Sequence, residues 1–518
     1  MPPPSSIYDR MKVFEEPFAY LVNNANVETF CSYCLRTPEG SKLSKCGGCD
    51  FARYCNKDCQ RLAWKDHKPE CARLKKSFPN LPLTEVLFLS RLMDRVAFLE
   101  KNGDRYGWEK DRKWSELLTH EEEIKEDKPK YAHFEKIYSK TLAYHGEDKM
   151  IPKEQFFIIF CKAAINSHSI HTNAGTEVGM ALDLGVSQYD HSCRPNCTLI
   201  FDGFRACLRP LTPDTNASDA KTSFISYIDV GRSRYQRRRD LKSKWYFDCQ
   251  CSRCLDTDDD ILTAIKCSTP GCDEPLITTE DSEPMYIACP KCKNTTEPDV
   301  VAKAQEFMRS LPGRFVFNAT QEEVNIVEDL LTKAKSMLHP KNIYFCRLQT
   351  AYLQMAGEQD ALLVTPETQK QVYENYRLCF PKADRHIGYQ LLHLVKSLIE
   401  KGEREEATTY AYEAMAIFEV CFGLEHPYYL QTLALWTYLD TKADKTNEEL
   451  IKLMNFNYNR PVNISQLLKG VQLNDAPTPK GVPSGRHQSA EFADSSMARY
   501  ATVLPLCYDD PAEFMELQ

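Results

Sequence analysis

Apolar and polar residues alternate with helical spacing in the C-terminal third of the chain. Thr320, with Glu323 three residues later, forms a capping box that marks a helix start. Apolar side chains then recur at positions that share one helix face: Val324, Val327, Leu331, Ala334 and Leu338. We therefore predict that residues 300–455 are helical.

The same region contains a weak repeat. The segments Leu338-His339-Pro340, Phe380-Pro381 and Glu425-His426-Pro427 punctuate it, and the residues after Gly402 (Ala407, Tyr410, Ala414) resemble a tetratricopeptide helix pair. An α-helical, TPR-like repeat domain is predicted, and a helical bundle without repeats is the alternative.

Upstream, the pattern changes to short elements. Residues 188–196 (QYDHSCRPN) are polar and turn-rich, which predicts a loop. Residues 223–229 (SFISYID) are apolar and β-branched, which predicts a strand that ends near Tyr227. No apolar run reaches 18 residues and the first residues lack a long apolar core, so we expect neither a membrane span nor a secretory signal.

Composition narrows the functional classes. The 518 residues suggest three or four units, and the charge sum of 65 basic and 73 acidic residues gives −8, which argues against nucleic acid as the main partner. One basic run, Arg232–Lys244, stands out; we interpret it as a solvated helix face, with an acidic substrate segment or a nuclear signal as alternatives.

The 22 Cys need an explanation other than disulfides, because a cytoplasmic or nuclear chain does not keep them. Closely spaced pairs indicate metal ligands, since a short turn aims two thiolates at one ion. The first group holds eight ligands, enough for two tetrahedral zinc sites: Cys31, Cys34, Cys46, Cys49, Cys55, Cys59, His67 and Cys71. The alternative is a Cys-rich core.

Two further Cys groups follow. Cys249, Cys251 and Cys254 supply three thiolates, so either a distant residue completes the site or an open, catalytic position remains. The four thiolates of Cys267, Cys272, Cys289 and Cys292 predict a structural zinc ribbon with a short hairpin between its two pairs. Two unrelated Cys pairs are the alternative.

The first group, with Tyr54 and Trp64, resembles a MYND zinc finger. The resemblance implies interleaved sites, with Cys31, Cys34, Cys55 and Cys59 on one ion and Cys46, Cys49, His67 and Cys71 on the other. It also implies that the finger binds proline-rich peptides.

The loop at His191 and Cys193, taken alone, would also fit a thiol protease. Together with Tyr227 and the Cys-x-Cys-x2-Cys triplet, it resembles the SET domain of protein lysine methyltransferases. A SET domain split by a MYND finger is typical of the SMYD family, and the resemblance runs from about residue 8 to 256. The expected fold is α+β and multidomain: a β-rich SET fold split by the finger, a post-SET zinc site, an extra zinc ribbon and C-terminal helical repeats.

The resemblance also assigns roles. It implies that Cys193 joins Cys249, Cys251 and Cys254 in a closed structural site, which makes about four zinc ions, and it leaves seven Cys for cores. S-adenosylmethionine (SAM) is the implied cofactor and Tyr227 the implied catalytic residue. Cofactor contacts would come from His120, Asn166, Asp190, His191, Tyr227 and Phe247. A lysine channel would be lined by Tyr227, Trp245 and Phe247.

Two departures from the family pattern bear on activity. No Gly precedes Gly40, so we expect this chain to lack the Gly-x-Gly strand that lies beside the cofactor in the family. Asp190 stands where the family has Asn. An Asn side chain donates and accepts hydrogen bonds, whereas an ionised Asp only accepts them. The predicted function is SAM-dependent methylation of lysines in histone or other proteins. The alternatives are a catalytically impaired scaffold or corepressor adaptor and, on the basic patches alone, a nucleic-acid binder.

The predicted organisation follows from these assignments. We expect a cytoplasmic and nuclear monomer whose tail is partly flexible. The segments are residues 1–30 (first part of the SET domain), 31–71 (finger), 72–178 (helical insert), 179–231 (core SET), 232–256 (post-SET), 265–294 (ribbon), 300–455 (helical repeats) and 456–518 (tail).

Overall fold

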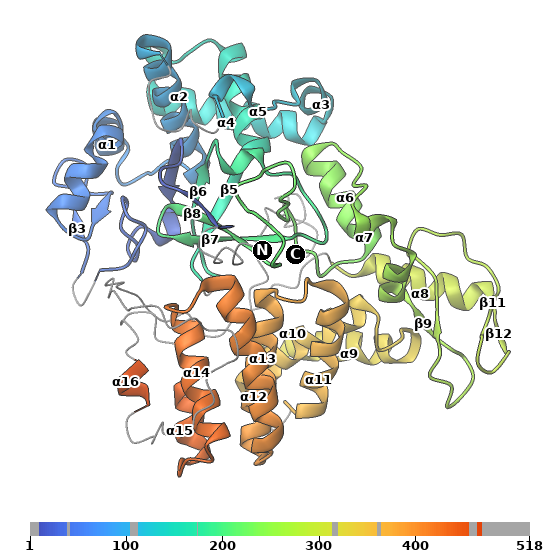
Figure 1. Cartoon of the computed structure of the whole chain (residues 1–518). Helices are drawn as coiled ribbons and strands as arrows, with labels where there is room; N and C mark the ends of the chain where they lie inside the picture. The colour runs from blue at the N-terminus through green and yellow to red at the C-terminus, as the bar shows by residue number, and fades with distance from the viewer. Residues whose placement is uncertain are drawn as a thin grey trace, which may run out of the picture.

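A computed structural model gives the architecture of the chain (Figure 1). It describes residues 10–38, 42–103, 112–173, 175–312, 320–359, 364–454 and 464–468. Among the helices in these ranges, none combines the length and the apolar character that a membrane crossing requires.

Two small antiparallel sheets form the centre of the molecule. One has the order β1-β8-β7, from Lys12–Phe14, Arg205–Pro210 and Cys197–Asp202. The other has the order β2-β6-β5, from Ala19–Val22, Glu177–Leu182 and Ser167–His171. In both sheets an N-terminal strand pairs with a strand more than 150 residues later, as in the register Val22 to Gly179. The segments between β2 and β5 are therefore insertions between strands of the same β core.

The Cys-rich finger is the first of these insertions. A short ladder of β3 (Ser44–Lys45) and β4 (Arg53–Tyr54) leads into helix α1 (Lys57–Ser77), which carries His67 and Cys71. Asn56 caps this helix by accepting from the Cys59 N–H. The finger touches the sheet at the β7–β8 turn. There Gly203 has φ of +61°, and a Cβ would lie 2.2 Å from the Cys34 carbonyl oxygen, so only glycine fits.

A group of helices forms the second insertion, at the top of Figure 1. Its members are α2 (Thr84–Asn102), α3 (Glu121–Glu126), α4 (Lys128–His145) and α5 (Lys153–Asn166). Their core is rich in aromatic rings, with Phe134 in edge contact with Phe157 at 4.7 Å. Strand β5 follows α5 directly, so the range 72–178, predicted as a helical insert, also supplies one strand of the sheet.

The strand predicted over 223–229 is absent from the described chain. This segment makes only an isolated parallel bridge, between His191 and Ile225. Its polar side chains bond to nearby backbone instead: Ser226 Oγ donates to the Ile228 carbonyl at 2.7 Å, and the Asp229 carboxylate accepts from the Gly231 N–H at 2.8 Å. Such local bonds bend the chain and compete with a ladder.

The predicted ribbon hairpin is also wrong in its pairing. Strand β10 (Pro275–Leu276) pairs with β9 (Ile265–Lys266), while β11 (Ile287–Ala288) pairs with β12 (Thr295–Thr296). Each Cys pair thus sits in its own two-stranded turn. The segment between the turns carries the buried Glu280 into the interior, where Ser233 and Tyr344 donate to its carboxylate.

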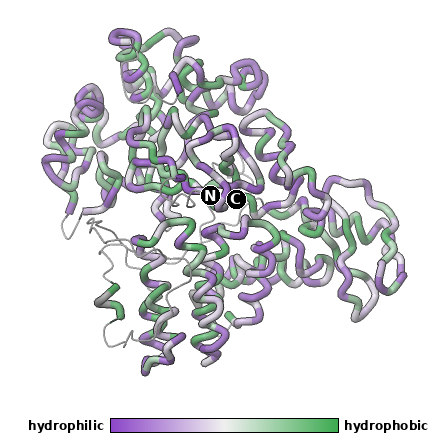
Figure 2. The backbone as a smooth tube through the Cα atoms, viewed as in Figure 1, coloured by the Kyte–Doolittle hydropathy of each residue, from purple (hydrophilic) through white to green (hydrophobic). Residues whose placement is uncertain are grey.

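The C-terminal half is helical, as predicted. Its helices are α8 (Pro298–Ser310), α9 (Gln321–Met337), α10 (Ile343–Gln359), α11 (Pro366–Cys379), α12 (Arg385–Lys401), α13 (Arg404–Phe422), α14 (Pro427–Asp440), α15 (Asn447–Leu453) and α16 (Ile464–Leu467). Figure 2 shows apolar and polar stretches alternating along them. The predicted capping box at Thr320 is formed. Pro340 and Pro381 lie between helices, and Pro427 is the first residue of α14. Whether these helices are tetratricopeptide repeats stays a prediction.

The helical half docks on the sheets through polar contacts. Arg209 of β8 donates to the Val420 carbonyl at 3.0 Å, and Arg385 of α12 donates to the Leu199 carbonyl at 3.1 Å. Tyr389 donates to the Asn173 carbonyl at 2.6 Å. Most of the predicted tail, 456–518, lies outside the described residues.

The basic run 232–244 is only partly a solvated face, because Arg239 and Lys242 are exposed whereas Arg232 is buried. It lies in and before helix α6 (Arg234–Trp245), and its cations pair with acids: Arg237 with Asp259 at 2.7 Å and Lys242 with Asp248 at 2.8 Å. Arg237 is completely buried. Because the pairs neutralise most of the run, it is a structural element rather than a basic patch.

Candidate functional site: four cysteine clusters and an aromatic cluster around Tyr227

The structure gathers the predicted metal ligands into four groups. In each, the four ligand atoms lie within 4.8 Å of one another. We call them finger cluster 1 (Cys31, Cys34, Cys55, Cys59), finger cluster 2 (Cys46, Cys49, His67, Cys71), the loop cluster (Cys193, Cys249, Cys251, Cys254) and the ribbon cluster (Cys267, Cys272, Cys289, Cys292). These are the sets expected from the sequence and the resemblance, including Cys193 from the distant loop.

The spacing of the sulfurs fits zinc. Around a tetrahedral ion with Zn–S bonds of about 2.3 Å, neighbouring sulfurs lie about 3.8 Å apart. The observed separations are 3.7 Å for Cys34–Cys55, 3.6 Å for Cys193–Cys254 and 3.6 Å for Cys267–Cys292. A disulfide would need about 2.05 Å. The clusters are therefore shaped for closed, structural zinc sites, in which all four positions are protein ligands.

The Cys outside the clusters were expected in cores. Among the described residues, Cys161, Cys197, Cys346, Cys379 and Cys421 are buried and Cys207 is half-buried. Cys507 lies outside the described residues.

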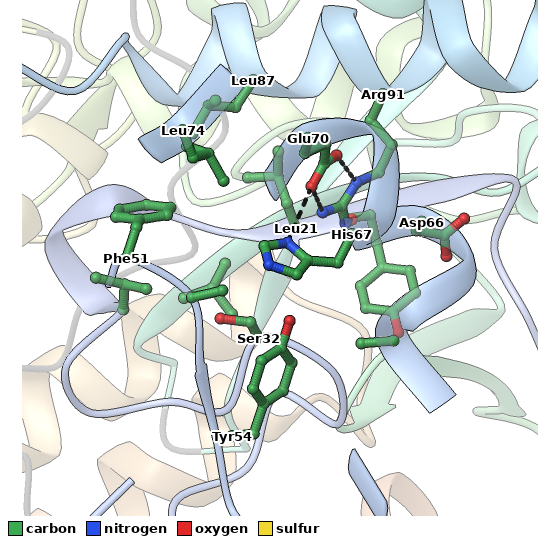
Figure 3. Close-up of a pocket in the computed structure, with 15 residues that line it drawn as sticks. Leu21, Ser32, Phe51, Tyr54, Asp66, His67, Glu70, Leu74, Leu87 and Arg91 are labelled. Carbon is green, nitrogen blue, oxygen red and sulfur yellow. Dashed lines mark hydrogen bonds and ion pairs between the residues drawn. The ribbon is translucent and has the colours of Figure 1, made fainter. Parts of the chain in front are cut away.

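Finger cluster 2 is tied to the central sheet by a buried ion pair (Figure 3). The Nε2 atom of His67 faces the cluster sulfurs, and its Nδ1 lies 3.8 Å from the Glu70 carboxylate. Glu70 is held in a fork by Arg91 of α2 at 2.6 and 2.8 Å, and Arg91 also donates to the Tyr20 carbonyl of β2. A carboxylate commonly faces the second nitrogen of a metal-binding histidine, and Glu70 takes this place at ion-pair rather than hydrogen-bond distance.

A small cavity of about 40 Å³ adjoins this ion pair. Its lining comes from the finger, from β2 and from α2, and includes Tyr54, Asp66 and Leu87 (Figure 3). At this size the cavity admits water but not a cofactor or a peptide.

Tyr227 stands in a second, aromatic region. Its ring centroid lies 5.1 Å from that of Trp245 and 5.3 Å from that of His191, and the His191 ring lies 6.2 Å from Phe247. The Tyr227 hydroxyl donates to the Tyr189 carbonyl at 2.6 Å. Burial, with the nearby Asp190 charge, raises the pKa of Tyr227 well above its ordinary value, so the hydroxyl keeps its proton.

His191 is buried beside the loop cluster. Its Nδ1 accepts from the Tyr227 N–H at 3.0 Å and its Nε2 lies 3.2 Å from the Cys193 sulfur. Burial lowers the pKa of His191 to about 4, so the ring is neutral near pH 7.

The other predicted cofactor residues lie on the insert side of this region. Asn166, at the end of α5, donates to the Leu118 carbonyl at 2.9 Å. His120 precedes α3 with a left-handed backbone, and its ring lies 5.4 Å from Tyr246. Trp245 connects the helical insert to the Tyr227 region, because its indole N–H donates to the Ile165 carbonyl of α5 at 3.0 Å and its ring lies against Tyr227.

Asp190 is exposed, and its backbone rather than its side chain is engaged: the Asp190 carbonyl accepts from the Ile225 N–H at 3.1 Å. The structure therefore brings the rings of Tyr227, His191, Trp245 and Phe247 into one cluster. His120 and Asn166 lie near this cluster and contact its neighbours, Tyr246 and Leu118.

Sequence reasoning missed a buried charged centre beside the loop cluster. Arg253, between two of its Cys, donates to the carbonyls of Val230 and Cys379, both at 2.7 Å, and pairs with Asp259 at 2.7 Å. Arg237 pairs with the other oxygen of Asp259. No rule of residue spacing predicts that Arg237 and Arg253 share the carboxylate of Asp259. The sequence shows only that several arginines lie close to the Cys ligands.

Fold and site together define a multidomain zinc protein in which a finger and a helical group interrupt a small β core. A family model for the MYND finger matches residues 31–71. The chain is 26% identical to Histone-lysine N-methyltransferase SMYD3 of Homo sapiens over 427 residues, which cover 79% of this chain and 88% of that protein. It is 25% identical to Histone-lysine N-methyltransferase ASHR1 of Arabidopsis thaliana, over 80% and 87% of the two chains.

SET domain and MYND-type zinc finger protein 6 of Schizosaccharomyces pombe is 32% identical over 234 residues, 45% of this chain and 44% of that protein. The chain thus contains a MYND finger and is similar, over about four fifths of its length, to proteins of the SMYD type.

Proposed function

We propose that this chain is a SAM-dependent protein-lysine N-methyltransferase, acting on histone or other proteins, with Tyr227 as its catalytic residue. The observation that carries the proposal is the half-buried Tyr227 side chain, whose ring lies against those of Trp245 and His191. Relatives that match four fifths of the chain bear the names of histone-lysine N-methyltransferases, which supports the same reaction here.

The side chains around Tyr227 suit this chemistry. Aromatic walls from Trp245 and Phe247 would desolvate a lysine ε-amine, which lowers its pKa and favours the neutral nucleophile. The neutral amine would accept the methyl group that the cofactor supplies, and the resulting ammonium would lose its proton to water. SAM supplies the methyl group as a sulfonium cation. Tyr227 and the walls would hold the amine in place for the transfer.

The test is methyl transfer from labelled SAM by the full-length chain to a histone mixture. Tyr227→Phe removes only the hydroxyl and should lower the rate about 100-fold or more. Tyr412→Phe is the matched control, because Tyr412 lies 46% exposed on α13 against Trp436. A full-length chain that neither binds SAM nor methylates any protein contradicts the proposal and leaves the scaffold alternative.

We also propose zinc as the metal in all four clusters. The chain would act as a monomer in the cytoplasm and nucleus, and its finger would bind proline-rich peptides through the exposed Leu62 and Trp64 of α1. Metal analysis should give about four zinc ions per chain; two would contradict zinc in the loop and ribbon clusters.

A further inference from the structure

The ribbon exposes two large apolar side chains next to each other. Met285 is 65% exposed and Tyr286 is 68% exposed, the highest values among the large apolar side chains of the described residues. Both residues directly precede β11, and Figure 1 shows β11 and β12 at the edge of the molecule, beyond α8. Single exposed apolar residues are common on proteins, whereas an adjacent pair that stands clear of the body suits contact with another molecule.

The chain that leads to this pair is firmly held. The carboxylate of the buried Glu280 accepts from the hydroxyls of Ser233 and Tyr344. The side chain of Gln305, buried on α8, donates to the Thr279 carbonyl at 2.8 Å. The backbone before the exposed pair is therefore anchored to α8, to α10 and to the start of α6.

The chain that follows the pair is held as well. Ile287 lies opposite Thr296 in the ladder of β11 and β12, and Cys289 belongs to the ribbon cluster. Both ends of the exposed segment are thus fixed by contacts within the chain. Because its backbone is already ordered, a partner that binds there does not have to offset the entropy of ordering it.

The charge around the apolar pair is negative. Asp281 and Glu283 are exposed, and no Lys or Arg of the described chain forms an ion pair with either carboxylate. The cations that follow in the ribbon are engaged elsewhere: Lys291 pairs with Asp273, and Lys293 donates to a ribbon carbonyl at 2.7 Å. An apolar pair beside two unneutralised acids is complementary to a partner with both apolar and basic side chains.

We propose that residues 281–286, the docking segment, bind a basic segment of the substrate protein that also carries an apolar side chain. Met285 and Tyr286 would contact that apolar side chain, and the two carboxylates would attract its Lys or Arg neighbours. The proposal deepens the proposed function and rests on it for the identity of the bound protein as a substrate. Docking at a second surface raises the local concentration of the substrate, so it lowers KM and leaves kcat unchanged.

The first experiment measures the binding of a fluorescein-labelled peptide that repeats the triplet Lys-Arg-Leu to the full-length chain, by fluorescence anisotropy. Met285→Ser combined with Tyr286→Ser should weaken binding about 30-fold, because two large side chains no longer bury apolar surface against the peptide. Asp281→Asn combined with Glu283→Gln should weaken binding about tenfold at low ionic strength and make it less sensitive to salt.

Matched controls assign the effect to the docking segment. Ile326→Ser and Asp329→Asn change exposed residues of α9, where Ile326 is 52% exposed, and both variants should bind the peptide as the wild type does. A peptide that repeats Glu-Asp-Leu should bind the wild type about tenfold or more weakly than the basic peptide. The substituted side chains of the docking segment are all exposed, so these variants should keep the wild-type zinc content and melting temperature.

The proposal is overturned if the two peptides bind equally, or if the variant with Met285→Ser and Tyr286→Ser binds the basic peptide as the wild type does. Self-association of the wild type in sedimentation, abolished in this variant, would also overturn it, because a second copy would then be the occupant.

Methyl transfer to histones tests the link to the substrate. The variant with Met285→Ser and Tyr286→Ser should raise KM about tenfold and keep kcat within about twofold of the wild type. An unchanged KM would overturn the role in substrate docking. If the wild-type chain transfers no methyl group, the proposed function fails, whereas anisotropy still decides whether the docking segment binds a basic peptide.

Discussion

Replacing Arg253 by methionine is expected to detach the loop cluster from the C-terminal helices. The guanidinium is 1% exposed and reaches four parts of the chain: it donates to the carbonyls of Cys193, Val230 and Cys379 and pairs with Asp259. Methionine keeps the apolar stem and removes every donor.

The expected loss of stability is about 3 kcal/mol. Removing one partner of a buried ion pair costs about 3–5 kcal/mol, and leaving buried carbonyls unpaired costs about 1–3 kcal/mol each. The lower end applies because Arg237 still neutralises Asp259, at 2.7 Å. Against a total of about 5–15 kcal/mol for a folded domain, this loss is large.

Hydrogen exchange is the suitable assay, because a multidomain zinc protein is not expected to unfold in two states. Amides of α11 and of residues 223–231 should exchange about 100-fold faster in Arg253→Met, which corresponds to about 3 kcal/mol. Arg194→Met is the matched control. Arg194 pairs with Asp256 at 3.2 Å but is 50% exposed, so its loss should cost less than about 1 kcal/mol. Equal protection in the two variants would show that the buried centre does not join these parts.

Three further perturbations test other parts of the molecule. In Glu280→Gln, the neutral amide keeps an acceptor for Ser233 and Tyr344. Burial raises the pKa of Glu280, so the folded chain holds its proton more tightly and stability falls as pH rises above the ordinary value of 4.5. The variant's melting temperature should therefore exceed the wild type's by more at pH 8 than at pH 5, and an equal difference would contradict the buried charge. Gly388→Ala puts a Cβ 2.5 Å from the buried Phe418 ring and should cost about 1–3 kcal/mol in thermal unfolding; a neutral effect would mean that the α12–α13 contact is loosely packed. Removal of metal with a strong chelator should expose thiols of all four clusters to a thiol reagent and unfold the finger, followed by circular dichroism; retained finger structure without metal would contradict a structural role.

Most of the metal-ligand predictions came from the spacing of the cysteines along the sequence. Pairs two to four residues apart can share an ion whatever the surrounding fold, so ligands such as Cys289 and Cys292 were predictable from local geometry. The helical C-terminal half was predictable for a similar reason, since the spacing after Thr320 is a property of one helix and its cap.

Contacts between distant segments were decided only by the tertiary structure. Spacing left the fourth ligand of Cys249, Cys251 and Cys254 open, and the resemblance alone pointed to Cys193. The strand expected over 223–229 does not form, because the side chains of Ser226 and Asp229 bond to backbone groups two residues later and only an isolated bridge to His191 remains.

The sequence by itself determined which residues bind metal in pairs, which segments are helices and which family the chain resembles, because each of these depends on neighbours along the chain. The tertiary structure decided that Arg237 is buried rather than solvated, that Arg253 joins four segments and that His191 lies between a zinc thiolate and Tyr227. The physical reason is that burial and hydrogen-bond direction depend on partners from other segments, and no local pattern specifies which partner a buried charge or ring will meet.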